Sequence, residues 1–235
     1  MNALHFDRDE VDRLIAKLVC DPEAFERGGF ANDLLKQFLR GHPIDVLRRL
    51  LHHSDGGVTR AAIWIASELP VFAPALLSDA LPALTSPDRY VRFYALDVVM
   101  LGAVGEDEEE FVRVVEALDD PDVAVKDHAL FLISHATNGQ ILAAIKRFRR
   151  ADPSSHHLPG LGALADARSA NPIAVREMIE SNSEVDRKYG LAIAERCYDV
   201  HPDLLEMAAR SGDKLIRSLA AHMLKQHGIA KARRD

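Results

Sequence analysis

A turn, a basic residue and a helix rich in small residues recur along this chain at nearly constant spacing. Five copies can be read from the sequence, and their basic residues are Arg60, Arg92, Lys126, Arg187 and Arg217. A sixth copy without a basic residue fits near His157, so that successive copies lie 30–34 residues apart. Such a period is typical of an array in which each unit buries its apolar face only against its neighbours.

The segments around these turns have helical periodicity. Apolar residues recur three and four positions apart, and no sustained alternation of apolar and polar residues indicates a strand. An amphipathic helix is expected to precede each turn, over residues 44–53, 74–84, 107–118, 140–149, 173–181 and 202–210. The sequence therefore predicts an all-α chain built from pairs of helices.

The turns contain acids that can start the helix that follows them. A carboxylate there can accept hydrogen bonds from the free N–H groups of the first helical turn, where proline is also tolerated. The basic residue one turn later can pair with an acid of its own copy or of the adjacent one. We therefore expect Asp120, Asp122 and Lys126, like Asp88 and Arg92, to stabilise the fold rather than to carry function.

The pattern Asp-Pro-Asp-x-x-Val-Lys/Arg before an Ala/Leu-rich helix resembles a HEAT repeat of the short bacterial type, best at residues 86–102 and 117–134. The resemblance covers most of residues 44–228. It implies one domain over residues 1–235, an α-solenoid of about six to seven helical pairs in a right-handed superhelix. Residues 1–43 would be N-terminal capping helices, and residues 229–235 a frayed basic tail. Around residues 153–170 the chain departs from the pattern, because this copy lacks the basic residue of the turn and carries Gly160 and Gly162, so a kink is expected there.

Catalytic motifs are missing from the sequence. It contains no His-Glu-x-x-His, no His-Glu pair of the kind that HEAT-type di-iron hydroxylases use, no P-loop and no nucleophile elbow. The pairs His52-His53 and His156-His157 could bind a metal adventitiously, but solvated helix ends explain them more simply. We therefore expect no catalytic residue, no metal and no cofactor, and a protein that is not an enzyme.

The net charge and the length of the apolar runs limit which kinds of partner and which cellular location are expected. With 29 basic and 36 acidic residues the net charge is −7, which does not favour non-specific binding of nucleic acid. No apolar run reaches the roughly 20 residues that span a bilayer. No secretory signal is visible, and Cys20 and Cys197 form no metal or redox spacing. A cytoplasmic protein without membrane contact is expected.

The negative charge is concentrated in one window. Residues 106–127 contain ten acids and two bases, a sum of −8, while basic clusters lie at residues 146–150 and in the tail. Acids early in a helix often form only a solvated face, but such a patch would also steer a basic partner. Glu108, Glu109 and Glu110 are the candidates for this contact.

Positions that do not pack between helical pairs would line a concave face. On this concave face one helical pair would present Phe93 and Asp97, and the next pair Asp127 and Phe131. The last helical pair would present His222. Aromatic anchors ringed by charge are typical of interface hot spots, although both rings could instead belong to the core. These five residues and the three glutamates form the predicted partner-binding set.

The sequence thus favours a non-enzymatic module that binds a basic protein partner through its concave face and acidic patch. One form would be an immunity or antitoxin-type inhibitor of a basic toxin domain, as a monomer or a partner-bound heterodimer. Alkylpurine DNA glycosylases, an alternative, share the size and the solenoid but use an aromatic-rich basic cleft with a catalytic Asp. Trp64, the one tryptophan, is expected in the core instead. A second alternative is a scaffold or maturation chaperone for another enzyme. It would differ from the proposed binding module only in the protein that it binds.

Overall fold

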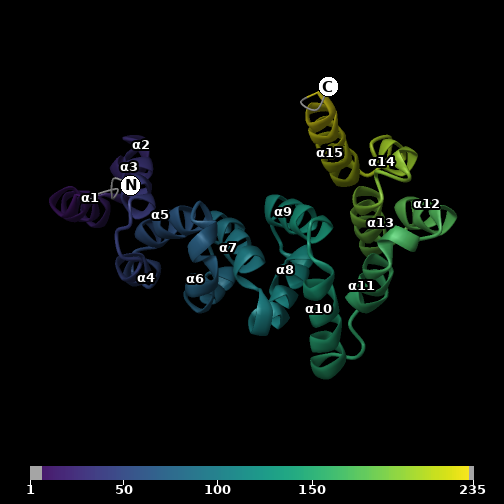
Figure 1. The fold of residues 1–235 in the computed structure, drawn as a ribbon, viewed down its shortest axis with the longest axis horizontal. Helices are drawn as coiled ribbons and strands as arrows, with labels where there is room; N and C mark the ends of the chain where they lie inside the picture. The colour runs from purple at the N-terminus through teal and green to yellow at the C-terminus, as the bar shows by residue number, and fades with distance from the viewer. Residues whose placement is uncertain (1–6, 233–235) are drawn as a thin grey trace, which may run out of the picture. The chain divides into compact units, whose positions relative to one another are not determined.

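The computed structural model describes the backbone of residues 7–232, and their side chains except those of Glu106 and residues 229–232. Throughout this range the chain forms helices and turns and no strand (Figure 1). The prediction of an all-α chain is therefore confirmed.

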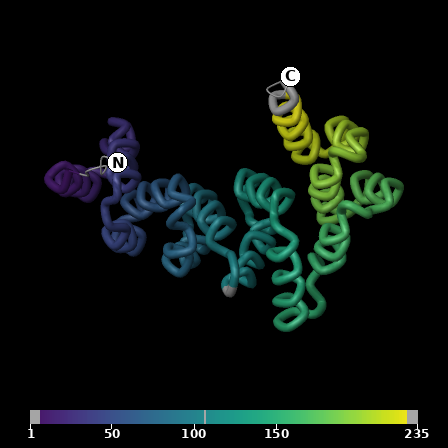
Figure 2. Tube along the Cα trace, in the orientation of Figure 1, coloured from purple at the N-terminus to yellow at the C-terminus, as the bar shows by residue number. Residues whose placement is uncertain are grey.

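The chain divides into two compact units, which are described separately. The N-terminal unit comprises Met1–Gly105 and the C-terminal unit Glu106–Asp235. Figure 2 traces both along the chain. Gly105, the last residue of the N-terminal unit, has a φ of 59°, a conformation that favours glycine. The expectation of a single domain over residues 1–235 stays a prediction.

In the N-terminal unit, the central helix is the one after the first recurring turn, α5 (Gly56–Ser67). Six of its twelve residues are buried, and it packs against α2, α3, α4, α6 and α7. The other helices are α1 (Arg8–Cys20), α2 (Pro22–Arg27), α3 (Phe30–Leu39), α4 (Asp45–Leu51), α6 (Ala73–Ala80) and α7 (Arg89–Gly102), with 3-10 turns at Pro70–Phe72 and Leu81–Thr85. Helices α1 to α3 occupy the region expected to cap the array.

In the C-terminal unit, α13 (Glu184–Arg196) is central and is buried continuously from Lys188 to Ala194. It packs against α9, α11, α12, α14 and α15. The other helices are α8 (Val112–Glu116), α9 (Val123–Ser134), α10 (Asn138–Ala151), α11 (His157–Ala165), α12 (Pro172–Glu180), α14 (Pro202–Ala208) and α15 (Lys214–Ala232). Three 3-10 turns lie at Gly105–Phe111, Ala117–Asp119 and Ala167–Ser169.

The recurring turn has the same hydrogen bonds in each of five copies. Its first residue accepts, through its side chain, the backbone N–H two residues later. That second residue in turn caps the next helix through its own side chain. The first residues are His53, Ser86, Asp120, Ser181 and Ser211, and the caps are Asp55, Asp88, Asp122, Ser183 and Asp213. The predicted role of the acids in starting helices is confirmed.

The basic residue of the turn folds back onto it. Arg92, Arg187 and Arg217 each donate to the backbone carbonyl six residues earlier, at 2.8, 2.8 and 2.7 Å. In the first copy Thr59 makes this bond instead, to the carbonyl of His53, so the register that aligned Arg60 with Arg92 is wrong by one residue.

Ion pairs also join one turn to the next. Arg60 pairs with Asp88 at 3.3 Å, and Arg187 with Asp213 at 2.9 Å. Each cation reaches the capping acid of the following copy, as the sequence predicted. The recurring turns therefore stabilise both their own helix and the adjacent pair.

The helix expected over residues 107–118 is wrong. These residues form a 3-10 turn, the short α8 and a second 3-10 turn. At the other end α15 continues to Ala232, because Ile-Ala-Lys-Ala contains no helix breaker. The backbone of residues 229–232 is therefore helical, residues 233–235 lie outside the described range, and the frayed basic tail stays a prediction.

Within the described residues, no single helix is both long enough and apolar enough to cross a bilayer. The segments Gly56–Ser67 and Pro70–Thr85 reach that length and apolarity only together, across a bend of 96°. The cytoplasmic location expected from the sequence stays a prediction.

Candidate functional site

A pocket in the N-terminal unit gathers aromatic side chains from two helices. It has a volume of about 460 Å³ and lies where α5 and α7 face the turn between α2 and α3. Trp64 and Arg60 line it from α5, and Tyr90 and Tyr94 from α7. The rest of the lining is Glu26, Gly29, Ala31, Asn32 and Ala61.

Trp64 was expected in the core, and that expectation is wrong in part. Its ring packs against the core on one side and lines the pocket on the other. The signal that could have revealed the pocket is spacing, because Arg60 and Trp64, like Tyr90 and Tyr94, lie four residues apart and so share a helix face. Tyr90 remains 46% exposed, while the Arg89 guanidinium lies 4.8 Å from the centre of its ring and donates to its hydroxyl at 2.9 Å.

The charged groups of the pocket bind each other. The Arg60 guanidinium donates to both carboxylate oxygens of Glu26, at 3.0 and 3.2 Å. The hydrogen bonds to Glu26 raise the pKa of Arg60 above its ordinary value, and burial raises that of Tyr94. The pocket therefore offers aromatic faces and a paired, fixed charge rather than a free cation.

Three residues of the predicted partner-binding set come together in the C-terminal unit. Phe131 of α9 is half-buried, and its ring lies 6.4 Å from that of His222 on α15 and 4.5 Å from that of His135. Asp127 is also half-buried, one turn earlier on α9. Among the described residues Oδ1 of Asp127 has no hydrogen-bond partner. Burial, and secondarily Asp213, raise the pKa of Asp127 to about 6 against the pull of Lys188.

The other two members of the predicted face belong to the N-terminal unit. Phe93 and Asp97 are both half-buried on α7, and the ring of Phe93 meets that of Tyr94 edge-on at 5.4 Å. The half-burial of Phe93 and Phe131 fits a contact residue as well as a core residue. The partner-binding role of all eight residues stays a prediction.

The acidic run, residues 107–110, forms ion pairs in part with the basic cluster at residues 146–150. Glu109 pairs with Lys146 at 3.1 Å and with Arg150 at 2.6 Å, and these hydrogen bonds lower the pKa of Glu109. Glu110 lies 3.9 Å from Arg113. Glu108 covers the backbone of Gly139, where an added Cβ would fall 2.6 Å from its carboxylate. The run is therefore less available to a partner than the sequence suggested.

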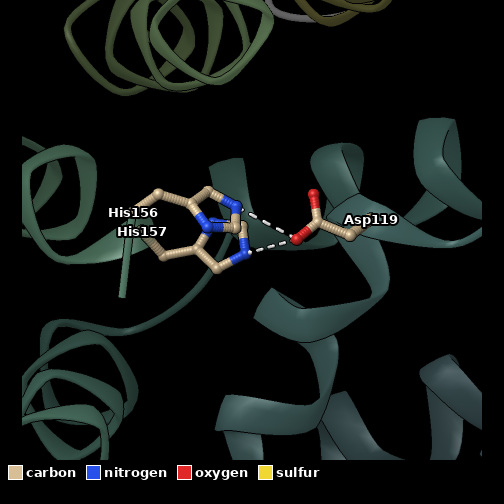
Figure 3. A group of neighbouring side chains, drawn as sticks. All are labelled: Asp119, His156 and His157. Carbon is tan, nitrogen blue, oxygen red and sulfur yellow. Dashed lines mark ion pairs between the residues drawn. The ribbon is translucent and has the colours of Figure 1, made fainter. Parts of the chain in front are cut away.

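A second arrangement in the C-terminal unit consists of Asp119, His156 and His157 (Figure 3). The Nε2 atoms of both histidines approach the same oxygen, Oδ2 of Asp119, at 3.0 and 3.2 Å. The side chain of His157 is 4% exposed, while those of His156 and Asp119 are 55% and 49% exposed. Their ligand atoms all lie within 4.8 Å of one another, so these side chains could hold a metal ion, although none was expected.

Comparison of the sequence with protein-family models and with curated proteins finds no match. The function is therefore inferred from the geometry of the described residues.

Proposed function

We propose that this chain is a non-enzymatic protein-interaction module whose HEAT-like helical pairs stack into an α-solenoid. Two observations support the stacking. The same turn hydrogen bonds recur in five copies along the sequence, and ion pairs from Arg60 and Arg187 reach the next copy's cap. Because one helical pair cannot bury its apolar face alone, such links between neighbours are what an array requires.

The pocket beside Trp64 is the proposed contact site for the partner, and its lining is the observation that carries the proposal. Tryptophan, tyrosine and arginine are the residues most enriched in interface hot spots, and all three line this pocket. Its volume of about 460 Å³ is within the ordinary range for binding pockets. A protruding apolar or aromatic side chain of the partner would stack on these rings.

The charges of this pocket support a protein partner over nucleic acid. Arg60 is bound by Glu26, and the rest of the lining carries no charge. Nucleic acid would need several cations free to contact phosphates, so a glycosylase-like role gains no support from this pocket. A protein surface, which presents apolar side chains between polar ones, suits it better.

A basic partner remains part of the proposal. Lys146 and Arg150 offset only part of the acidic window, so residues 106–127 keep a net negative charge that would steer such a protein at low salt. An inhibitor of a basic toxin domain and a scaffold for a basic client would use this same chemistry.

We expect Tyr90→Ala to weaken partner binding by more than tenfold, because it removes an exposed anchor ring from the pocket. Trp64→Ala should weaken it further, since hot-spot truncations cost about 2 kcal/mol or more, roughly 30-fold in Kd. The partner is identified by affinity purification from the native host, and its Kd for each variant is then measured by calorimetry.

Ile173→Ala is the control for this experiment, because Ile173 is an exposed apolar residue that does not line the pocket. It should leave the Kd unchanged. Tyr90→Ala keeps the core intact and so separates binding from folding. A partner whose Kd is the same for wild type and Tyr90→Ala would refute the pocket as the contact site.

A further inference from the structure

The chain brings Asp119 close to His156 and His157 by reversing direction. Asp119 ends the 3-10 turn after α8, and the two histidines stand at the start of α11, with α10 between them packed against both α8 and α11. In Figure 3 both imidazole rings face one carboxylate oxygen. Three ligand-type side chains from two distant segments thus converge on one point.

We propose that Asp119, His156 and His157 bind a divalent transition-metal ion, with Zn²⁺ as the best match. Imidazole nitrogen with carboxylate oxygen is a ligand set that suits zinc, whereas calcium and magnesium prefer oxygen alone. In a tetrahedral zinc site with bonds of about 2.0–2.1 Å, ligand atoms lie about 3.3 Å apart. The nitrogen–oxygen separations of 3.0 and 3.2 Å are close to that value, so the ion needs only a small adjustment of these side chains.

The start of α11 does not depend on the His156 side chain. His156 occupies the N-cap position and makes no side-chain hydrogen bond to the helix, while the hydroxyl of Ser155 accepts the backbone N–H of His157 at 3.4 Å. The imidazole of His156 is therefore not used as a cap and faces Asp119 instead.

Packing holds the buried ligand in place. The ring of His157 lies 5.8 Å from Phe148 and 6.1 Å from Tyr189, and its Nε2 is directed at Asp119. The nearby Lys188 ammonium is bound at 2.7 Å by Glu184 and at 2.7 Å by the carbonyl of Leu118, so its charge is compensated.

The exposure of the other two ligands leaves space for solvent. Asp119 and His156 are each about half-exposed, so three protein ligands and at least one water would complete the coordination. Three protein ligands with water in the fourth position distinguish open zinc sites from closed structural sites, which have four protein ligands. The fold should therefore form without the ion and bind it reversibly, independently of the partner pocket in the other unit.

The chain also contains a matched control. His52-His53 is a second histidine pair, and Nε2 of His52 lies 2.9 Å from Oδ1 of Asp79. His53 is used differently, because its Nδ1 accepts the backbone N–H of Asp55 at 3.1 Å. Only one imidazole of this pair thus reaches the carboxylate, and we expect no zinc site there.

Titration of the full untagged chain with ZnCl₂ in a calorimeter should give one ion per chain. His156→Ala and Asp119→Ala should each weaken binding by more than about tenfold, since even outer-shell changes cost about 10- to 100-fold. His52→Ala should leave the affinity unchanged. Co²⁺ should give the visible absorption of a low-symmetry site in the wild type and lose it in His156→Ala.

Both altered ligands are half-exposed, so circular dichroism should show the variants folded. Absence of zinc binding by the wild type would overturn the proposal. Binding that His156→Ala leaves intact, or that His52→Ala weakens equally, would show that surface histidines bind an adventitious ion only, and would overturn it too.

Discussion

Gly160→Ala should lower the free energy of unfolding by about 2 kcal/mol. A Cβ at this position would fall 2.1 Å from Cδ2 and 2.3 Å from Cγ of Tyr189, far inside contact distance. The Tyr189 ring is fully buried on α13, so it cannot move aside without displacing the centre of the unit. Overpacking of this kind costs about 1–3 kcal/mol or more, and the better helix propensity of alanine returns only about 1 kcal/mol.

Gly162→Ala is the matched control in the same helix. Nothing lies within 4 Å of a Cβ added there, so alanine should stabilise the chain by about 0.5–1 kcal/mol through helix propensity alone. Urea unfolding followed by circular dichroism measures both variants. Equal effects of the two substitutions would contradict the close packing of α11 on α13.

The contrast between these glycines shows what the sequence could predict. The caps and basic residues of the recurring turns follow from local chemistry, so their roles were visible in the sequence. Gly160 and Gly162 stood out equally as departures from the repeat, and a kink was expected there. The contact that distinguishes them is with a ring 29 residues away, which no local pattern contains.

The candidate sites were harder to predict for the same reason. A lone tryptophan among small residues predicts a core position for Trp64, because its partners Tyr90 and Tyr94 come from another helix. Glu109 and Arg150 belong to separate charge clusters in the sequence, and only the packing of α10 brings them into an ion pair. Asp119 was one acid among ten, and only the fold places it beside the two histidines.

Asp127→Asn should stabilise the protein at pH 8 by about 1–2 kcal/mol. The pKa of Asp127 is about 6 in the folded chain against 3.8 for the free side chain, with burial as the main cause. Between these two values the folded state binds more protons than the unfolded state, so stability falls as pH rises through them and stays lowered above pH 6. The shift corresponds to about 3 kcal/mol, and solvent screening of a half-buried group reduces it to the value given.

The amide removes the charge that burial and Asp213 disfavour, while Lys188 keeps its bonds to Glu184 and to the carbonyl of Leu118. Urea unfolding at pH 8 and at pH 4 tests this, because the gain should nearly vanish at pH 4, where folded Asp127 is already protonated. Asp199→Asn, at an exposed acid, should change stability at neither pH. A gain of the same size at both pH values would contradict the charge argument. A stabilising Asp127→Asn variant with weakened partner binding would mean that this carboxylate lowers stability and serves recognition, as its place one turn before Phe131 on α9 predicts.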